Sequence, residues 1–127
     1  MRVALDTNRY RDLCDGETGV VSLLEEAERV YVPFAVVGEL RAGFALGRRG
    51  RQNEAVLQRF LAKPGVEVLY PGDATTRFYA SLFRQLRRQG TPIPTNDLWI
   101  AALVVEHSLF LCSRDGHFRS LPQLNIV

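Results

Sequence analysis

The sequence predicts an α/β fold in which a parallel sheet is covered on both faces by helices. Short apolar runs typical of fully buried strands alternate along the chain with longer segments of helical periodicity. Glycine and proline separate many of these segments, as expected at turns. The expected strands cover residues 2–5, 30–32, 66–69, 109–112 and a short fifth segment at 125–127, and the expected helices cover residues 7–14, 18–29, 33–46, 51–63, 73–89 and 96–107.

The first half of the chain alternates a strand with two helices, twice in succession. Residues 2–5 form an apolar run, and the segment 18–29 places Val20 and Leu24 on the same side of a helix. Pro33 suits the first turn of the next helix, because its φ angle is already helical and no N–H is needed there. Two glycines then separate this helix from the one that follows.

The second half of the chain contains the clearest helix. Residues 66–69 form a short apolar strand after a proline–glycine pair, and the segment 73–89 follows. Phe78, Leu82 and Leu86 recur at i, i+4 and i+8, which places them on one face of a helix. A glycine ends this helix, and a proline-rich turn leads into an apolar helix and the fourth strand.

Length and composition indicate an ordinary globular protein. A chain of 127 residues fits a single domain, here residues 1–127, and its 46% hydrophobic and 24% charged residues exclude a disordered chain. No apolar run reaches the roughly 20 residues of a membrane span, and a charge follows the N-terminus too soon for a signal peptide. We therefore expect a cytoplasmic protein without membrane contact. Two cysteines without CxxC spacing are expected to be reduced thiols.

Four carboxylates lie beside apolar segments, where a solvated charge is least expected. Asp6 ends the first apolar strand, Glu39 lies inside a helical segment, Asp97 opens an apolar helix, and Asp115 follows the strand 109–112. Isolated carboxylates are costly to desolvate, and a bound cation is one of the few partners that offset the cost. Because functional groups gather at the carboxyl ends of parallel strands, these four acids are expected to share a site.

Ordinary structural roles compete with this interpretation. Asp6 could cap the helix that follows it, Asp97 could interact with a helix dipole, and Asp115 with Gly116 forms a common turn pair. Glu39 is harder to explain in this way, because it has no cationic side chain at i±3 or i±4. A buried glutamate in that position needs a metal ion, a distant arginine or a raised pKa.

The donor set suits a hard divalent cation. Mg²⁺ or Mn²⁺ binds carboxylate oxygens and water, can lower the pKa of a water molecule and can neutralise charge on a phosphodiester. Thr7, Asn8, Thr95 and Asn96 supply neutral hydrogen-bonding groups beside the acids, as groups that orient metal ligands do.

Four sequence blocks resemble, in order and spacing, the acidic blocks of PIN-domain proteins. The blocks are Val3-Ala4-Leu5-Asp6-Thr7-Asn8, Val36–Gly43, Pro94–Ala102 and Leu111–Phe118, and the compact length resembles the VapC-type toxins of bacterial toxin–antitoxin pairs. The resemblance implies a three-layer α/β/α sandwich with a central, mostly parallel sheet. It also implies a homodimer and an endoribonuclease dependent on Mg²⁺ or Mn²⁺, neutralised by a small VapB-like antitoxin.

Carried over by position, the resemblance makes Asp6, Glu39, Asp97 and Asp115 the acidic quartet. Asp6 and Asp97 are the best candidates for direct metal ligation, while Glu39 and Asp115 are expected to position water or complete the coordination shell. The leading hypothesis is therefore a toxin that hydrolyses RNA phosphodiester bonds. The alternatives are a non-catalytic PIN-like module that binds RNA or a protein, and a metal-dependent phosphatase acting on small molecules.

Basic side chains supply candidates for RNA contact. Only one of the 16 basic residues is lysine, and arginine is the better bidentate partner for phosphate. Arg9, Arg11 and Arg114 lie beside the acidic blocks and are the candidates closest to the expected site. His107 and His117 lack zinc-like spacing, so they are expected on the surface or behind the metal ligands.

Overall fold

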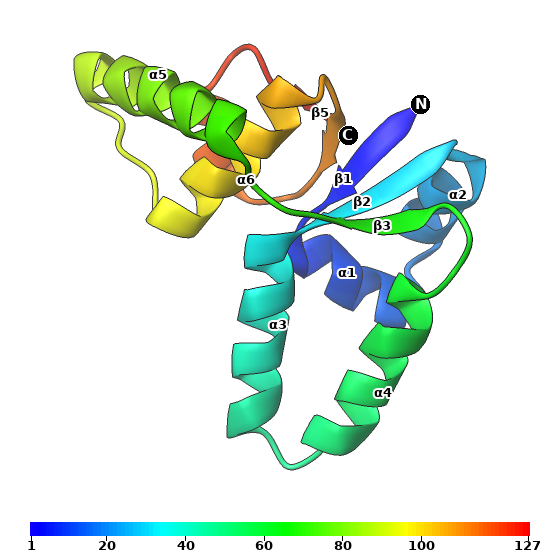
Figure 1. Ribbon diagram of the computed structural model, residues 1–127. Helices are drawn as coiled ribbons and strands as arrows, with labels where there is room; N and C mark the ends of the chain where they lie inside the picture. Colours follow the sequence, from blue (N-terminus) through cyan, green and yellow to red (C-terminus); the bar gives the residue numbers. More distant parts are fainter.

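The computed structural model describes residues 1–127 and shows a five-stranded parallel sheet between two layers of helices (Figure 1). The strands are β1 (Arg2–Leu5), β2 (Arg29–Pro33), β3 (Val66–Leu69), β4 (Phe110–Cys112) and β5 (Asn125–Ile126). The helices are α1 (Thr7–Cys14), α2 (Thr18–Glu26), α3 (Phe34–Leu46), α4 (Gly50–Leu61), α5 (Asp73–Gln89), α6 (Thr95–Glu106) and the 3₁₀ helix η1 (Gly116–Ser120). The predicted α/β fold with a central parallel sheet is confirmed.

The strand order β3-β2-β1-β4-β5 explains where a site can form. The chain runs outward from β1 through β2 to β3, then crosses to the other side of β1 for β4 and β5. Val3 of β1 pairs with Val30 of β2 on one side and with Phe110 of β4 on the other. The order therefore reverses between β1 and β4, and a crevice opens beyond the carboxyl ends of these two strands.

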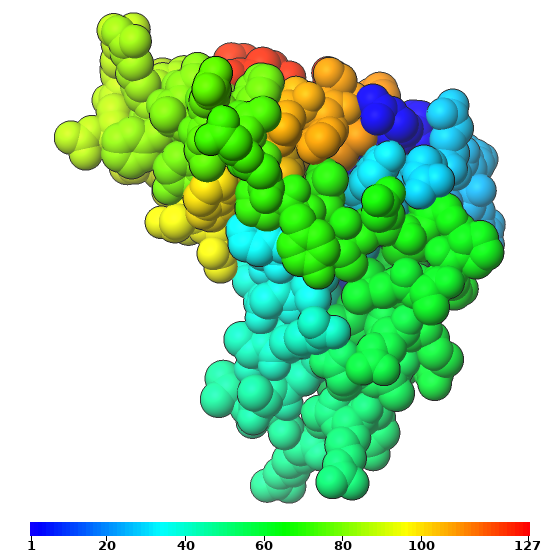
Figure 2. Space-filling model, viewed as in Figure 1, coloured from blue at the N-terminus to red at the C-terminus, as the bar shows by residue number.

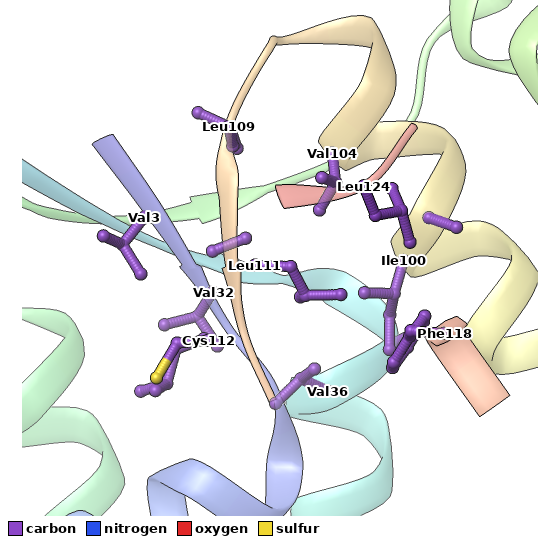
Figure 3. Close-up of a cluster of buried hydrophobic side chains, with 14 of the residues drawn as sticks. Val3, Val32, Val36, Ile100, Val104, Leu109, Leu111, Cys112, Phe118 and Leu124 are labelled. Atoms are coloured by element: carbon purple, nitrogen blue, oxygen red, sulfur yellow. The ribbon is translucent and has the colours of Figure 1, made fainter. Parts of the chain in front are cut away.

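Alternating side chains of the strands fill the core on both faces of the sheet (Figure 3). On β4, Cys112 points to the same side as Val32, and Leu111 points to the opposite side, toward Ile100 of α6. Phe118 of η1 is fully buried on the same side of the sheet as Ile100. Helices α1, α2 and α4 cover one face of the sheet, and α5 and α6 cover the other (Figure 1). The core thus holds the ends of β1 and β4 rigidly in place.

Helices α3 and α4 project from the carboxyl side of the sheet as a two-helix arm (Figures 1 and 2). Arg41 of α3 and Glu54 of α4 link the two helices through a salt bridge of 3.0 Å. Leu46 at the end of α3 is 91% exposed, so the tip of the arm is solvated. The base of the arm lies against the sheet edge, and this places the middle of α3 beside the crevice.

Apart from α2 and η1, the element boundaries lie within two residues of the sequence prediction. The predicted helix 18–29 ends at Glu26, because Ala27 has an extended backbone and Arg29 of β2 already pairs with Arg2 of β1. The 3₁₀ helix η1 was not predicted, since five residues carry no helical periodicity. Gly90 ends α5 with a φ of 72°, a left-handed conformation that glycine adopts without strain. A membrane-spanning helix is absent, since none of the helices combines the necessary length and apolar character.

Candidate metal centre

The four predicted acids gather at the carboxyl edge of β1 and β4. Asp6 follows β1 directly, and its backbone N–H donates to the carbonyl oxygen of Cys112 at the end of β4, 3.0 Å away. Asp97 lies in the first turn of α6, and Asp115 caps η1 three residues after the end of β4. Glu39 reaches the same edge from the middle of α3. Residues separated by more than one hundred positions thus share one crevice.

Asp6 is held by two hydrogen bonds and is only 4% exposed. Its Oδ1 accepts the backbone N–H of Thr7 at 2.8 Å, and its Oδ2 accepts the hydroxyl of Ser113 at 2.6 Å. Burial raises the pKa of Asp6, the two hydrogen bonds oppose the rise, and the charge of Asp115 adds to it. Asp6 therefore does cap α1, as one alternative stated, but the capping bond uses only part of its acceptor capacity.

Glu39 carries the clearest unsatisfied group of the site. The residue is half-buried, but its Oε1 is fully buried and accepts no hydrogen bond. Burial raises the pKa of Glu39, and the charges of Asp6 and Asp97 raise it further. The nearby side chain of Thr7 lowers the pKa of Glu39 by a smaller amount. The hydroxyl of Thr7 forms no hydrogen bond in this structure. A buried acceptor without a donor is costly, and a cation would satisfy it.

The expectation that Glu39 lacks a local salt bridge agrees with the structure. Arg41, two residues further along α3, pairs instead with Glu54 across the arm at 3.0 Å. The charge of Arg11 lowers the pKa of Glu39, but this effect is smaller than those of burial and the neighbouring acids. Glu39 therefore faces the other carboxylates without a compensating ion pair.

Asp97 and Asp115 meet at the imidazole of His117. The Nδ1 atom of His117 lies 2.8 Å from Oδ2 of Asp97 and 3.1 Å from Oδ1 of Asp115. Burial raises the pKa of Asp97, the hydrogen bond to His117 opposes the rise, and the charges of Asp115 and Asp6 add to it. The hydrogen bond to Asp97, together with the charge of Asp115, raises the pKa of His117. One ligand atom from each residue lies within 4.8 Å of the other two, so these three groups could bind one ion.

An open pocket of about 430 Å³ lies above these groups. Every lining residue is polar or charged except one proline: Glu39, Pro94, Thr95, Asn96, Asp97, Asp115 and His117. Another hollow, of about 630 Å³, lies elsewhere, among α1, α2 and α4, and is mostly apolar. The polar pocket is the one suited to ionic chemistry, because its walls offer several oxygen ligands and remain open to solvent.

The predicted neutral neighbours of the acids all lie near the site. The backbone N–H of Thr7 donates to the first acid, and Oδ1 of Asn8 accepts the backbone N–H of Arg114 at 3.4 Å. Thr95 and Asn96 line the polar pocket. Their influence on a bound metal stays a prediction.

Two of the three arginines proposed for RNA contact are already paired. Arg9 and Arg114 bind Asp12 at 3.2 and 2.9 Å, and the hydrogen bond from Arg114, followed by that from Arg9, lowers the pKa of Asp12. Arg11 is exposed, and its charge acts on Glu39. Arg11 is therefore the most available of the three for a phosphate near the acids.

Sequence reasoning did not single out Ser113 or place His117 against the acids. Ser113 is buried and bridges the site, since its hydroxyl donates to Asp6 and accepts the backbone N–H of Asp115 at 3.0 Å. Only the pairing of β1 with β4 brings Ser113 to Asp6. The only sequence feature that could have indicated these two residues is their position, since Ser113 and His117 each lie two residues from Asp115.

The family model described as PIN domain matches residues 3–124, nearly the whole chain. The chain belongs to the PIN-domain family. It is similar to ribonuclease VapC4 of Mycobacterium tuberculosis, with 26% identity over 96 residues that cover 76% of this chain and 74% of that protein. It is also similar to ribonuclease VapC2 of Rickettsia felis, with 26% identity over 105 residues that cover 82% of this chain and 77% of that protein.

Solved structures share the same PIN architecture. The crystal structure of VapBC2 from Rickettsia felis bound to a promoter DNA fragment matches with a TM-score of 0.87 and 23% identity, covering 100% of this chain and 98% of that chain. The structure of FitAcB from Neisseria gonorrhoeae matches with a TM-score of 0.79 and 27% identity, covering 98% of this chain and 95% of that chain. At 23% identity, the first likeness establishes the fold alone.

Proposed function

We propose that this PIN-domain chain is a metal-dependent endoribonuclease and the toxin of a toxin–antitoxin pair. The observation that carries the proposal is the convergence of Asp6, Glu39, Asp97 and Asp115 at one open edge, with the buried Oε1 of Glu39 lacking any donor. The names of the relatives, ribonuclease VapC4 and ribonuclease VapC2, support the same reaction class.

The residues present fit Mg²⁺ or Mn²⁺. Carboxylate oxygens are the ligands such hard cations prefer, and the unpaired oxygen of Glu39 supplies an acceptor that no protein group satisfies. Asp6 and Asp97 would hold the ion directly, and Glu39 and Asp115 would complete its surroundings. When bound, the ion supplies positive charge that acidifies water and offsets the negative charge of the phosphodiester.

The protein contributes orientation and a proton acceptor. Ser113 and Thr7 fix both oxygens of Asp6, so this carboxylate does not need to reorganise during the reaction. Glu39 has a raised pKa and a free oxygen, which suits it to receive the proton of the water that attacks phosphorus. As the water oxygen bonds to phosphorus, the bond from phosphorus to one ribose oxygen breaks. That oxygen takes a proton from solvent and leaves as a hydroxyl, so the RNA chain is cut.

We further propose that residues 1–127 act as one domain, that the toxin forms a homodimer, and that a VapB-like antitoxin neutralises it in the cytoplasm. Structures with the same fold include a member of the VapBC family of toxin–antitoxin systems from Mycobacterium tuberculosis. The mostly apolar hollow of about 630 Å³ among α1, α2 and α4 offers a surface for an apolar antitoxin segment. A short gene for a DNA-binding protein next to the gene for this chain would support the pairing, and light scattering of the purified protein tests the dimer.

Replacement of single carboxylates tests the catalytic proposal. Asp6→Asn and Asp97→Asn should each abolish cleavage of RNA oligonucleotides. Neither should unfold the protein, because asparagine can still cap α1 at position 6 and nearly keeps the shape of the aspartate at position 97. Asp73→Asn is the matched control, since Asp73 is exposed and pairs only with Arg77 within α5. Full cleavage by both site variants, or by the native protein in excess EDTA, would contradict the proposal.

The same assay distinguishes the two other functions. Cleavage of RNA but not of small phosphate esters excludes a small-molecule phosphatase. RNA binding without cleavage in Mg²⁺ or Mn²⁺ would indicate the non-catalytic module instead.

A further inference from the structure

His117 is the only basic side chain that lines the polar pocket. A catalytic site built from four carboxylates does not require it. Its ring is about half exposed, with 52% of the side chain accessible, and its Nδ1 atom is directed at two of the acids. The position of this ring therefore needs an explanation of its own.

The local backbone holds the imidazole in this position. The backbone N–H of His117 donates to Oδ1 of Asp115 at 2.9 Å, and this hydrogen bond caps the start of η1. The next residue, Phe118, is fully buried in the core. These two contacts fix the backbone of His117, and the two carboxylates beside Nδ1 hold its ring. The placement of Nδ1 beside the acids is thus built into the fold.

The separations in the pocket suit metal coordination. Adjacent donors around an octahedral ion with bonds of about 2.1 Å lie about 3 Å apart. Nδ1 of His117 lies 2.8 Å from Oδ2 of Asp97 and 3.1 Å from Oδ1 of Asp115. These separations also suit hydrogen bonds. The ring could therefore exchange its hydrogen bonds to the two acids for a bond to a metal ion without moving far.

We propose that Nδ1 of His117 is a metal ligand beside Asp97 and Asp115, and that it makes the site prefer Mn²⁺ to Mg²⁺. This inference rests on the proposed metal-dependent function and adds the choice of ion. Mg²⁺ requires oxygen donors and keeps much of its water, whereas imidazole nitrogen is a softer donor that transition metals accept more readily. A mixed nitrogen and oxygen donor set therefore discriminates where carboxylates alone do not.

The competing role for His117 is a simple counter-charge that steadies the acids in the absence of metal. Both roles are compatible with the same metal-free contacts, because Nδ1 would give up its proton, and with it these hydrogen bonds, only when an ion binds. A direct nitrogen–metal bond separates them, because unpaired electron density of Mn²⁺ reaches only nuclei bonded to it or close by.

Pulsed electron paramagnetic resonance of the Mn²⁺-loaded protein provides the test. The wild-type spectrum should show strong coupling to an imidazole nitrogen, and isotopically labelled histidine should change this coupling. His117→Gln should abolish it, whereas His107→Gln should leave it intact. The control is well matched, because the chain has only two histidines and His107 contacts Glu106 rather than the pocket.

Titration calorimetry of the same variants measures ion preference without RNA. Loss of a group that only orients a metal ligand weakens metal binding by about 10- to 100-fold. Loss of a direct ligand should cost at least as much, so His117→Gln should weaken the affinity for Mn²⁺ at least about tenfold. Mg²⁺ affinity should fall less, because the glutamine amide oxygen is a hard donor. Circular dichroism should remain native, since this side chain is half exposed.

The outcomes separate this inference from the function on which it rests. Mn²⁺ binding without nitrogen coupling, or with an unchanged preference in His117→Gln, overturns the role of His117 and leaves the carboxylate site standing. Absence of Mn²⁺ and Mg²⁺ binding in the wild-type protein overturns both.

Discussion

Replacing Glu39 with glutamine should make the metal-free protein more stable while it destroys the site. The carboxylate is desolvated, lies near the charges of Asp6 and Asp97, and has a buried oxygen without a donor. Glutamine removes the charge and keeps nearly the same shape. The native fold therefore holds Glu39 at a thermodynamic cost that a bound ion would offset.

The size of the effect follows from the burial of this oxygen. The gain comes from removing the desolvated charge, because glutamine keeps an uncharged carbonyl oxygen in nearly the same place. An unsatisfied buried group costs about 1–3 kcal/mol, and the lower end applies because the residue is half exposed and solvent screens part of the charge. A gain of about 1 kcal/mol corresponds to a rise in Tm of about 4 °C for a chain of this size. Calorimetry in EDTA at neutral pH measures this rise. Added Mn²⁺ should stabilise the wild type more than Glu39→Gln.

The pH dependence of stability shows whether the charge of Glu39 opposes folding. The pKa of Glu39 is raised in the folded protein, so folding favours the protonated form. The cost is absent below the unfolded pKa of about 4.3 and grows as the pH rises through the higher folded pKa. The advantage of Glu39→Gln over the wild type should therefore be largest at neutral pH and shrink on acidification.

Glu54 provides the matched control on the neighbouring helix of the arm. Its hydrogen bonds from Arg41 lower the pKa of Glu54, so Glu54→Gln should leave Tm unchanged or lower it. A natively folded Glu39→Gln variant with an unchanged or lower Tm in EDTA would refute the reasoning, because it would mean that the ionised Glu39 does not oppose folding.

Three further changes test the surroundings of the site. Ser113→Ala should weaken metal binding by about 10- to 100-fold in calorimetry, because Asp6 loses the donor to its Oδ2; unchanged affinity would exclude this orienting role. Phe118→Ala should lower the free energy of unfolding by about 3–5 kcal/mol in denaturant titration, since it empties a fully buried position; a loss below about 1 kcal/mol would contradict the packing. Iodoacetamide should modify Cys14 and spare Cys112 in the native protein, because Cys14 is exposed while burial raises the pKa of Cys112 to about 11; mass spectrometry of the labelled peptides decides this.

Local sequence patterns predicted most of the fold for identifiable reasons. The segment 73–89 matches α5 at both ends, because its apolar residues repeat with helical spacing and Gly90 ends it with a left-handed backbone. The segment 18–29 was assigned three residues too many, since the pairing of Arg29 with β1 overrides local helical preference. Register within a sheet is a tertiary property, and the sequence of one segment does not contain it.

The candidate site also combines features that the local sequence predicts with contacts that only the tertiary structure shows. Asp6 and Asp115 were identifiable because each follows a buried strand, and Glu39 because no partner lies within one helical turn. The pairing of Arg114 with Asp12 was not, because it joins residues 102 positions apart. Such contacts depend on which strands become neighbours.

The amino-acid sequence by itself determined the alternation of strands and helices, the positions of the acids at element ends, and the resemblance to the PIN family. These properties follow from local periodicity and from the order of motifs. Only the tertiary structure decided that Ser113 holds Asp6 and that His117 joins Asp97 and Asp115. The physical reason is that β4 pairs beside β1, which brings the end of the chain against its beginning and gives each acid its neighbours.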